Sequence, residues 1–198
     1  MKKTVITVSR EYGSGGHNIA KALAERLGYT YYDELLLEKV AENTMLPENY
    51  IKEYGEYEVK PNIFSDIFMS KSSSQGKMYT YLFNEQKKVI EEIADKGNCV
   101  IVGRSADFFL KDREDTLNIF IFADMPFCVG RTMMKENLKI EEARKRIADM
   151  NEKRRLSYKR CTKQEWGARN NYDVLLNSSH LGIDGCVDFL EEIIKNSK

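Results

Sequence analysis

Three glycines near the amino terminus, in the stretch SREYGSGGHN, have the spacing of a phosphate-binding loop. The stretch follows a β-branched run and precedes an amphipathic helix, so backbone N–H groups would converge at a helix N-terminus. Compared with the pattern G-x-x-x-x-G-K-[ST], Arg10 stands for the first glycine and Gly16 for the lysine. His17 and Asn18 stand in the hydroxyl positions. The sequence therefore leaves two interpretations: a phosphate site whose cation comes from elsewhere, or a structural turn between a strand and a helix.

Other cations in the chain are candidates to complete such a site. Arg104 follows the apolar run CVIV, with one glycine between them, where ligands of open α/β sheets bind. Its planar guanidinium suits a phosphate, although a lone arginine more commonly forms a surface salt bridge. Further along, EKRRLSYKR holds five cations and one acid in nine residues. That density exceeds what a salt-bridged helix face needs, although most charge runs are solvated faces.

An acidic residue, Asp33, ends the second expected strand at the same edge of the sheet. It is a candidate acceptor contact, and its alternative role is the N-cap of the next helix. The two histidines have no carboxylate or cysteine cluster beside them in the sequence, and the four cysteines are widely scattered. We therefore expect neither a protein metal site nor a disulfide.

Five short apolar runs separated by helical patterns indicate an α/β fold with a parallel sheet. The expected strands are Thr4–Val8, Tyr29–Asp33, Cys99–Val102, Leu117–Ala123 and Tyr172–Asn177. From Asn43 to Met78 the pattern weakens, as in functional excursions inside compact folds.

Composition narrows the class of protein. The chain has 198 residues, 42% of them hydrophobic, and its 31 basic and 31 acidic residues give a formal net charge of zero. That balance gives no support for binding a nucleic acid polymer or an acidic membrane surface. No apolar run is long enough for a signal peptide or a membrane span. We expect one domain in a cytoplasmic protein; the oligomeric state stays open.

With these pieces in order, the chain resembles the cytidylate kinase-like family, a branch of the P-loop nucleoside monophosphate kinases. The resemblance rests on SREYGSGGHNIAKALAERLGYTYYD, IADKGNCVIVGRSADFFL, IFADMPFCVGR, EEARKRIADMNEKRRLSY and YDVLLNSSHLGI. It implies a three-layer P-loop kinase fold, with a five-stranded parallel sheet and helices on both faces, over residues 1–198. Within it, residues 43–78 would form an acceptor-binding insertion and residues 145–161 a lid.

The resemblance also implies roles for individual residues. The donor's phosphates would be held by Gly13, Ser14, Gly15, Gly16, His17 and Asn18. The catalytic cations would be Arg10, Arg104, Arg131, Arg154 and Arg155, and the acceptor would meet Asp33, Arg104 and Asp107. ATP would be the donor, and Mg²⁺ would be held through nucleotide phosphates and water.

The missing lysine makes the source of positive charge the central question. Arg10 lies at the entrance of the glycine-rich stretch and is expected to fold back over it and contact ATP, although it has the alternative of pairing with Glu11. Arg104 is expected to contact the acceptor. Both arginines are expected at the surface, so that replacing either would affect folding little.

Three functions are compatible with these residues. The first is ATP-dependent phosphoryl transfer to a nucleoside monophosphate, cytidylate-like, or to a similar small phosphorylated acceptor. The second is a nucleotide-binding regulatory protein without turnover, and the third is a kinase of another small metabolite. The partners expected are a nucleotide and a small phosphorylated acceptor.

Overall fold

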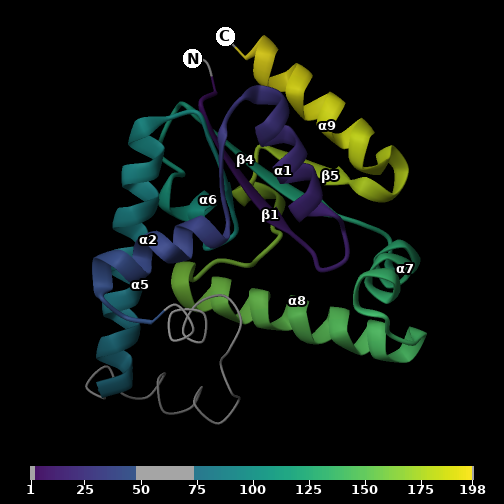
Figure 1. The fold of residues 1–198 in the computed structure, drawn as a ribbon, viewed down its shortest axis with the longest axis horizontal. Coiled ribbons are helices and arrows are strands. Elements are labelled where there is room, and N and C mark those ends of the chain that lie inside the picture. Colours follow the sequence, from purple (N-terminus) through teal and green to yellow (C-terminus); the bar gives the residue numbers. More distant parts are fainter. Residues whose placement is uncertain (1–2, 48–73, 198) are drawn as a thin grey trace.

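The computed structural model describes residues 3–47 and 74–197, and its centre is a five-stranded parallel sheet (Figure 1). The strand order is β2-β3-β1-β4-β5. The strands are β1 (Val5–Arg10), β2 (Thr30–Tyr32), β3 (Cys99–Val102), β4 (Thr116–Phe122) and β5 (Val174–Asn177). The predicted α/β class, with five parallel strands, is therefore confirmed.

Helices cover both faces of this sheet. They are α1 (Gly16–Leu27), α2 (Glu34–Thr44), α5 (Ser74–Lys96), α6 (Ala106–Phe109), α7 (Met125–Glu136), α8 (Ile140–Thr162) and α9 (Ser178–Asn196). Apolar residues of α1 and α9 share one core with the sheet, and those of α2, α5 and α6 share a second core on the other face. Helices α7 and α8 pack on each other, and Figure 1 shows α8 running across one edge of the sheet.

Strand β1 is the central strand of the sheet, and all of its residues are buried. Its β-branched residues favour such a position, covered on both faces. It pairs with β3 on one side and β4 on the other. The strand begins one residue later and ends two residues later than predicted, since Ser9 and Arg10 continue the register opposite Phe120 and Ile121. Arg10 is therefore the last residue of β1, and the glycine loop, which we define as residues 11–15, begins directly after it.

The other sequence predictions concern the lid, the acceptor-binding insertion, membrane helices and the cysteines. The lid expected at residues 145–161 lies inside the continuous 23-residue helix α8. Most of the expected acceptor-binding insertion, residues 48–73, lies outside the described residues. No helix in the described part of the chain is long and apolar enough to cross a membrane. All four cysteines are free thiols.

Candidate functional site: a glycine-loop cleft

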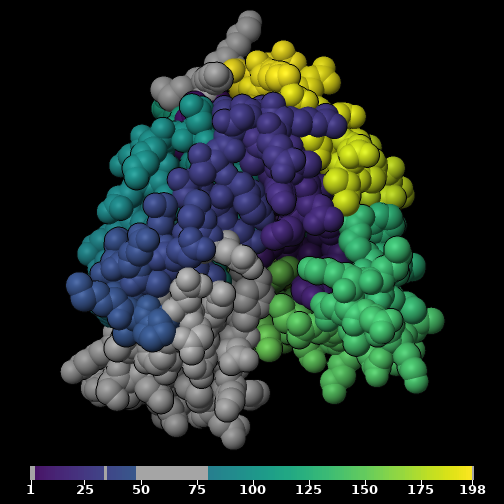
Figure 2. All heavy atoms as spheres, in the orientation of Figure 1, coloured from purple at the N-terminus to yellow at the C-terminus, as the bar shows by residue number. Residues whose placement is uncertain are grey.

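The carboxyl ends of β1 and β2 border a cleft of about 910 Å³ beside the glycine loop. The loop and the first turn of α1 line one side, Asp33 lies at the end of β2, and α7 and Arg154 line the other side. Figure 2 shows the hollow beside the blue-green residues of α7 and the start of α8. The predicted location of a ligand site, at the carboxyl edge of the sheet, agrees with this cleft.

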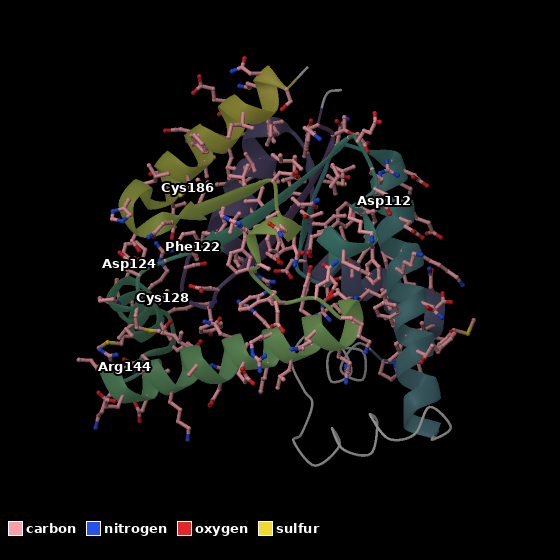
Figure 3. The ribbon with its side chains drawn as sticks, turned by 180° about the vertical axis from the view of Figure 1, so that it is seen from behind. Asp112, Phe122, Asp124, Cys128, Arg144 and Cys186 are labelled. Carbon is pink, nitrogen blue, oxygen red and sulfur yellow. The ribbon has the colours of Figure 1, made fainter. Side chains whose placement is uncertain are left out.

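The glycines of the loop are required by backbone conformation and by the close approach of α7. Gly13 and Gly15 have φ values of 80° and 81°, a region that residues with a side chain rarely adopt. A methyl group on Gly13 would lie 2.7 Å from the carbonyl oxygen of Cys128, in the first turns of α7. The loop is thus seated against α7, and Figure 3 labels Cys128 near Asp124 at this end of the molecule.

Arg131 of α7 lies directly against the glycine loop. A methyl group on Gly15 would overlap the Nη1 atom of Arg131 and lie 2.7 Å from its Cζ. The guanidinium carbon stands 4.6 Å from the centroid of the Phe127 ring, a cation–π contact that orients it. Burial lowers the pKa of Arg131. Among the described residues Nη1, although buried, finds no hydrogen-bond partner. A buried donor of this kind beside a phosphate-type loop points to an anionic ligand.

Arg10 occupies the space where a side chain at position 16 would lie. A methyl group on Gly16 would stand 2.5 Å from Cβ and 3.0 Å from Cγ of Arg10. This contact explains physically why the usual lysine position holds a glycine. Arg10 lines the cleft, but only 6% of it is exposed, so the expectation of a surface position is wrong. The cause is the later end of β1, which carries Arg10 into the sheet.

Tyr12, inside the glycine loop, attaches the loop to α7 and α8. Its backbone N–H donates to Oδ1 of Asn151 at 2.7 Å, and its hydroxyl donates to Glu136. The guanidinium groups of Arg146 and Arg154 both lie 5.6 Å from its ring centroid. Sequence reasoning missed Tyr12, because partners more than 120 residues away leave no local signal.

Arg154 is the arginine of α8 that reaches the cleft. Its Nη1 donates to the backbone carbonyl of Arg10 at 2.8 Å, and only 7% of the residue is exposed. Its neighbour Arg155 instead pairs with Glu152 on the outer side of α8, at 2.7 Å. The structure therefore brings Arg154 to the glycine loop and leaves Arg155 outside the cleft.

His17 and Asp33 contact each other in the wall of the cleft. Nδ1 of His17 lies 2.9 Å from Oδ2 of Asp33, and the Tyr31 hydroxyl lies 3.1 Å from the same nitrogen. Asp33 holds the N-cap position of α2, but its carboxylate faces His17 and makes no capping hydrogen bond. The pairing joins α1 to the end of β2, so these two predicted residues lie in one site.

Two other predicted residues, Ser14 and Arg104, do not line the cleft. Ser14 is the buried residue of the loop, and its hydroxyl donates to the carbonyl of Glu11 at 2.9 Å. Arg104 follows β3 and is 6% exposed, so its expected surface position is also wrong. Arg104 and Ser105 both have positive φ, 59° and 55°. Two adjacent non-glycine residues in this region are unusual and mark a constrained turn after β3.

Asp107 lies in a separate polar cavity of about 180 Å³ between α6 and the end of α8. Its Oδ2 accepts a 2.6 Å hydrogen bond from the Tyr158 hydroxyl, and 3% of the residue is exposed. Burial raises the pKa of Asp107 to about 6, partly offset by that hydrogen bond. Asp107 thus links α6 to α8 in this structure, and its contact with an acceptor stays a prediction.

A parallel five-stranded sheet with a glycine loop between its central strand and the first helix defines a P-loop kinase-type α/β protein. The sequence matches the profile of the cytidylate kinase-like family over residues 5–180, and the chain belongs to that family. The resemblance inferred from the sequence is confirmed.

Named relatives and solved structures agree with this assignment. A cytidylate kinase from Thermococcus kodakarensis is 26% identical over 183 residues, which cover 91% of this chain and 82% of that protein. One from Pyrococcus horikoshii is 26% identical, covering 92% and 84%. An uncharacterized protein from Eubacterium ventriosum has a TM-score of 0.75 at 23% identity, covering 98% of this chain and 99% of that one. Shikimate kinase from Bacteroides thetaiotaomicron has a TM-score of 0.54 at 15% identity, covering 97% and 98%. The structural likenesses support the kinase-type fold.

Proposed function

We propose that this protein transfers the γ-phosphoryl group of ATP to a nucleoside monophosphate, cytidylate-like, or to a similar small phosphorylated acceptor. The observation that carries the proposal is the Arg131 guanidinium, seated on Gly15 with a buried Nη1 that finds no partner among the described residues. It supplies positive charge at the loop where the usual motif would place a lysine. The names of the cytidylate kinase relatives support the choice of acceptor.

In this proposal the donor's phosphates bind at the glycine loop. The loop leads into the N-terminus of α1, whose dipole favours an anion. Arg10 and Arg154 add charge from β1 and α8, and both line the cleft with Arg131. Phosphoryl transfer depends mainly on positioning and on neutralising charge, so arginines of three elements are suited to the role.

Mg²⁺ would bind through the nucleotide rather than through a protein cage. The described residues contain no group of three or more histidine, cysteine or acidic side chains that could hold a metal ion. Glu11 and Asp33 line the cleft, and their carboxylates can hold the waters of a nucleotide-bound ion. When bound, the ion supplies charge neutralisation at the transferred group.

The acceptor's own phosphate oxygen is the nucleophile in this proposal. It attacks the γ-phosphorus as the bond to the bridging oxygen of ADP breaks, and no general base is required because the acceptor is already ionised. Asp33 lies where the acceptor would approach. Arg104 and Asp107 remain predicted acceptor contacts and Arg155 a predicted catalytic cation, although none of the three lines the cleft.

A coupled ADP-release assay over nucleoside monophosphates and small metabolites, with ATP and Mg²⁺, tests the proposal. With an accepted substrate, Arg131→Ala should lower turnover by roughly a hundredfold or more, as losing a transition-state charge contact does. Arg144→Ala, on the exposed part of α8 labelled in Figure 3, is the matched control and should keep full turnover.

The alternatives give different results in the same assay. ATP binding without turnover on any acceptor would favour the regulatory nucleotide-binding protein. Turnover only with an unphosphorylated metabolite would favour the third function. Full turnover by Arg131→Ala would show that the charge contact proposed here is wrong.

A further inference from the structure

Helix α8 brings an arginine to the cleft on the one face of the helix that is buried. The buried residues recur every three or four positions, which places them on the same face; they are Ala143, Ile147, Met150, Arg154, Tyr158 and Thr162. Arg154 is the charged member of this set. Arginine is rarely buried to this extent unless other groups contact it. The contacts of its guanidinium therefore determine where its charge lies.

Two groups from the amino-terminal part of the chain contact this guanidinium. Its Nη1 donates to the backbone carbonyl of Arg10 at 2.8 Å. Its Cζ lies 5.6 Å from the centroid of the Tyr12 ring, within the range of a cation–π contact. A carbonyl and a ring are both neutral, so these two contacts orient the guanidinium without cancelling its charge. Since the carbonyl belongs to the backbone, the Tyr12 ring is the contact that a substitution can remove.

The Tyr12 ring is itself held in place by α7 and α8. Its hydroxyl donates to Oε1 of Glu136 at the end of α7, and Oε2 of the same carboxylate accepts from Nε of Arg146 at 3.1 Å. The backbone N–H of Tyr12 donates to Oδ1 of Asn151 on α8 at 2.7 Å. A side chain fixed at its hydroxyl and at its backbone can hold a neighbouring group in one orientation.

We propose that Tyr12 is a positioning residue for phosphate binding, and that its ring holds the Arg154 guanidinium of α8 beside the glycine loop. The inference rests on the proposed function and deepens it, because it names the side chain that couples the loop to a cation of α8. Tyr12 does not touch the phosphate in this proposal. It acts only through Arg154.

The test is a double-mutant cycle, in which calorimetry measures the binding of inorganic tripolyphosphate at one pH without added metal. Tyr12→Leu removes the ring, and Arg154→Met removes the charge but keeps a long side chain. The third variant combines the two substitutions. Tyr12→Phe keeps the ring. Tyr81→Leu is the matched control, because Tyr81 is an exposed tyrosine on α5 that does not line the cleft.

Tyr12→Leu should bind tripolyphosphate about tenfold more weakly than the native protein, the scale of one partly buried cation–π contact. Arg154→Met should lose about tenfold or more, as a charged hydrogen bond does. The double variant should bind as Arg154→Met does, because the ring acts through the guanidinium. Tyr12→Phe and Tyr81→Leu should stay within about twofold of the native protein. Losses that multiply in the double variant would overturn the proposal, as would equal losses for Tyr12→Leu and Tyr12→Phe.

A second replacement tests the ring if Tyr12→Leu does not fold. Phenylalanine with a fluorinated ring at position 12 keeps the shape of phenylalanine but weakens the negative face of the ring. It should bind tripolyphosphate about threefold more weakly than Tyr12→Phe, and equal affinity would overturn the role of the ring. No binding by the native protein would overturn the phosphate site of the proposed function and, with it, this inference. Equal binding by the native protein and Tyr12→Leu would overturn this inference alone.

Discussion

The buried carboxyl group of Asp107 should make the stability of the protein depend on pH, and replacing it with asparagine should remove that dependence. The carboxyl group is almost fully buried and accepts one hydrogen bond from Tyr158. Burial raises its pKa from 3.8 to about 6. Asparagine keeps a carbonyl oxygen for the Tyr158 hydroxyl and cannot ionise.

The sign and size follow from the difference between the folded and unfolded states. Because the folded protein holds this proton more tightly, the stabilising contribution is complete well below the unfolded pKa of 3.8 and is lost as the pH rises through about 6. The raised pKa corresponds to about 3 kcal/mol in total, at about 1.36 kcal/mol per unit. Between pH 4 and pH 7.5 the expected loss of stability is about 2 kcal/mol, since part of the stabilising contribution has already been lost at pH 4.

Urea unfolding of both proteins at several pH values measures this effect. The difference in unfolding free energy between Asp107→Asn and the native protein should grow by about 2 kcal/mol from pH 4 to pH 7.5. Asp112→Asn is the control, because Asp112, labelled in Figure 3, is an exposed aspartate in the turn after α6. Parallel stability curves for the native protein and Asp107→Asn would refute the reasoning.

Two further predictions concern the glycine loop. Gly15→Ala should abolish the binding of inorganic tripolyphosphate, because the added methyl group would overlap Arg131. The control is Gly28→Ala, which is also at positive φ but has nothing within 4 Å; it should cost about 1 kcal/mol of stability and leave binding unchanged. Equal binding by both variants would contradict the role of Arg131. Tyr12→Phe should lower the unfolding free energy by about 1 kcal/mol through the lost hydrogen bond to Glu136, and Tyr12→Ala by about 3 kcal/mol, in urea denaturation. A Tyr12→Phe variant as stable as the native protein would show that the hydroxyl contributes nothing, and equal losses for the two variants would show that the ring contributes nothing.

The sheet could be predicted from the sequence because its information is local. The run CVIV is apolar and β-branched, and the strand Cys99–Val102 has the predicted limits. The first strand was predicted to end two residues too early, since Ser9 and Arg10 are polar and their place in the sheet depends on pairing with β4. Burial of a polar residue by tertiary pairing leaves no pattern in the sequence around it.

The candidate site was predicted only where chain order alone determines position. The loop residues and Asp33 lie at strand ends, so a parallel sheet brings them to one edge. Asp107 and Arg155 lie on helices, where the side that faces the cleft depends on rotation and packing. Arg154 and Arg155 are adjacent in sequence, yet one hydrogen-bonds the carbonyl of Arg10 and the other pairs with Glu152.

The glycine loop has no lysine of its own, and the positive charge beside it comes from Arg131 of α7. A lysine in the loop is positioned by the loop's own backbone, whereas Arg131 is positioned by the packing of α7. That packing depends on Gly13 and Gly15, which allow α7 to approach, and on Tyr12, which binds Glu136 at the end of α7 and Asn151 on α8. The positive charge at the glycine loop is thus a property of three elements that fold together. For this reason the motif is incomplete in the sequence while three arginines of different elements line the cleft.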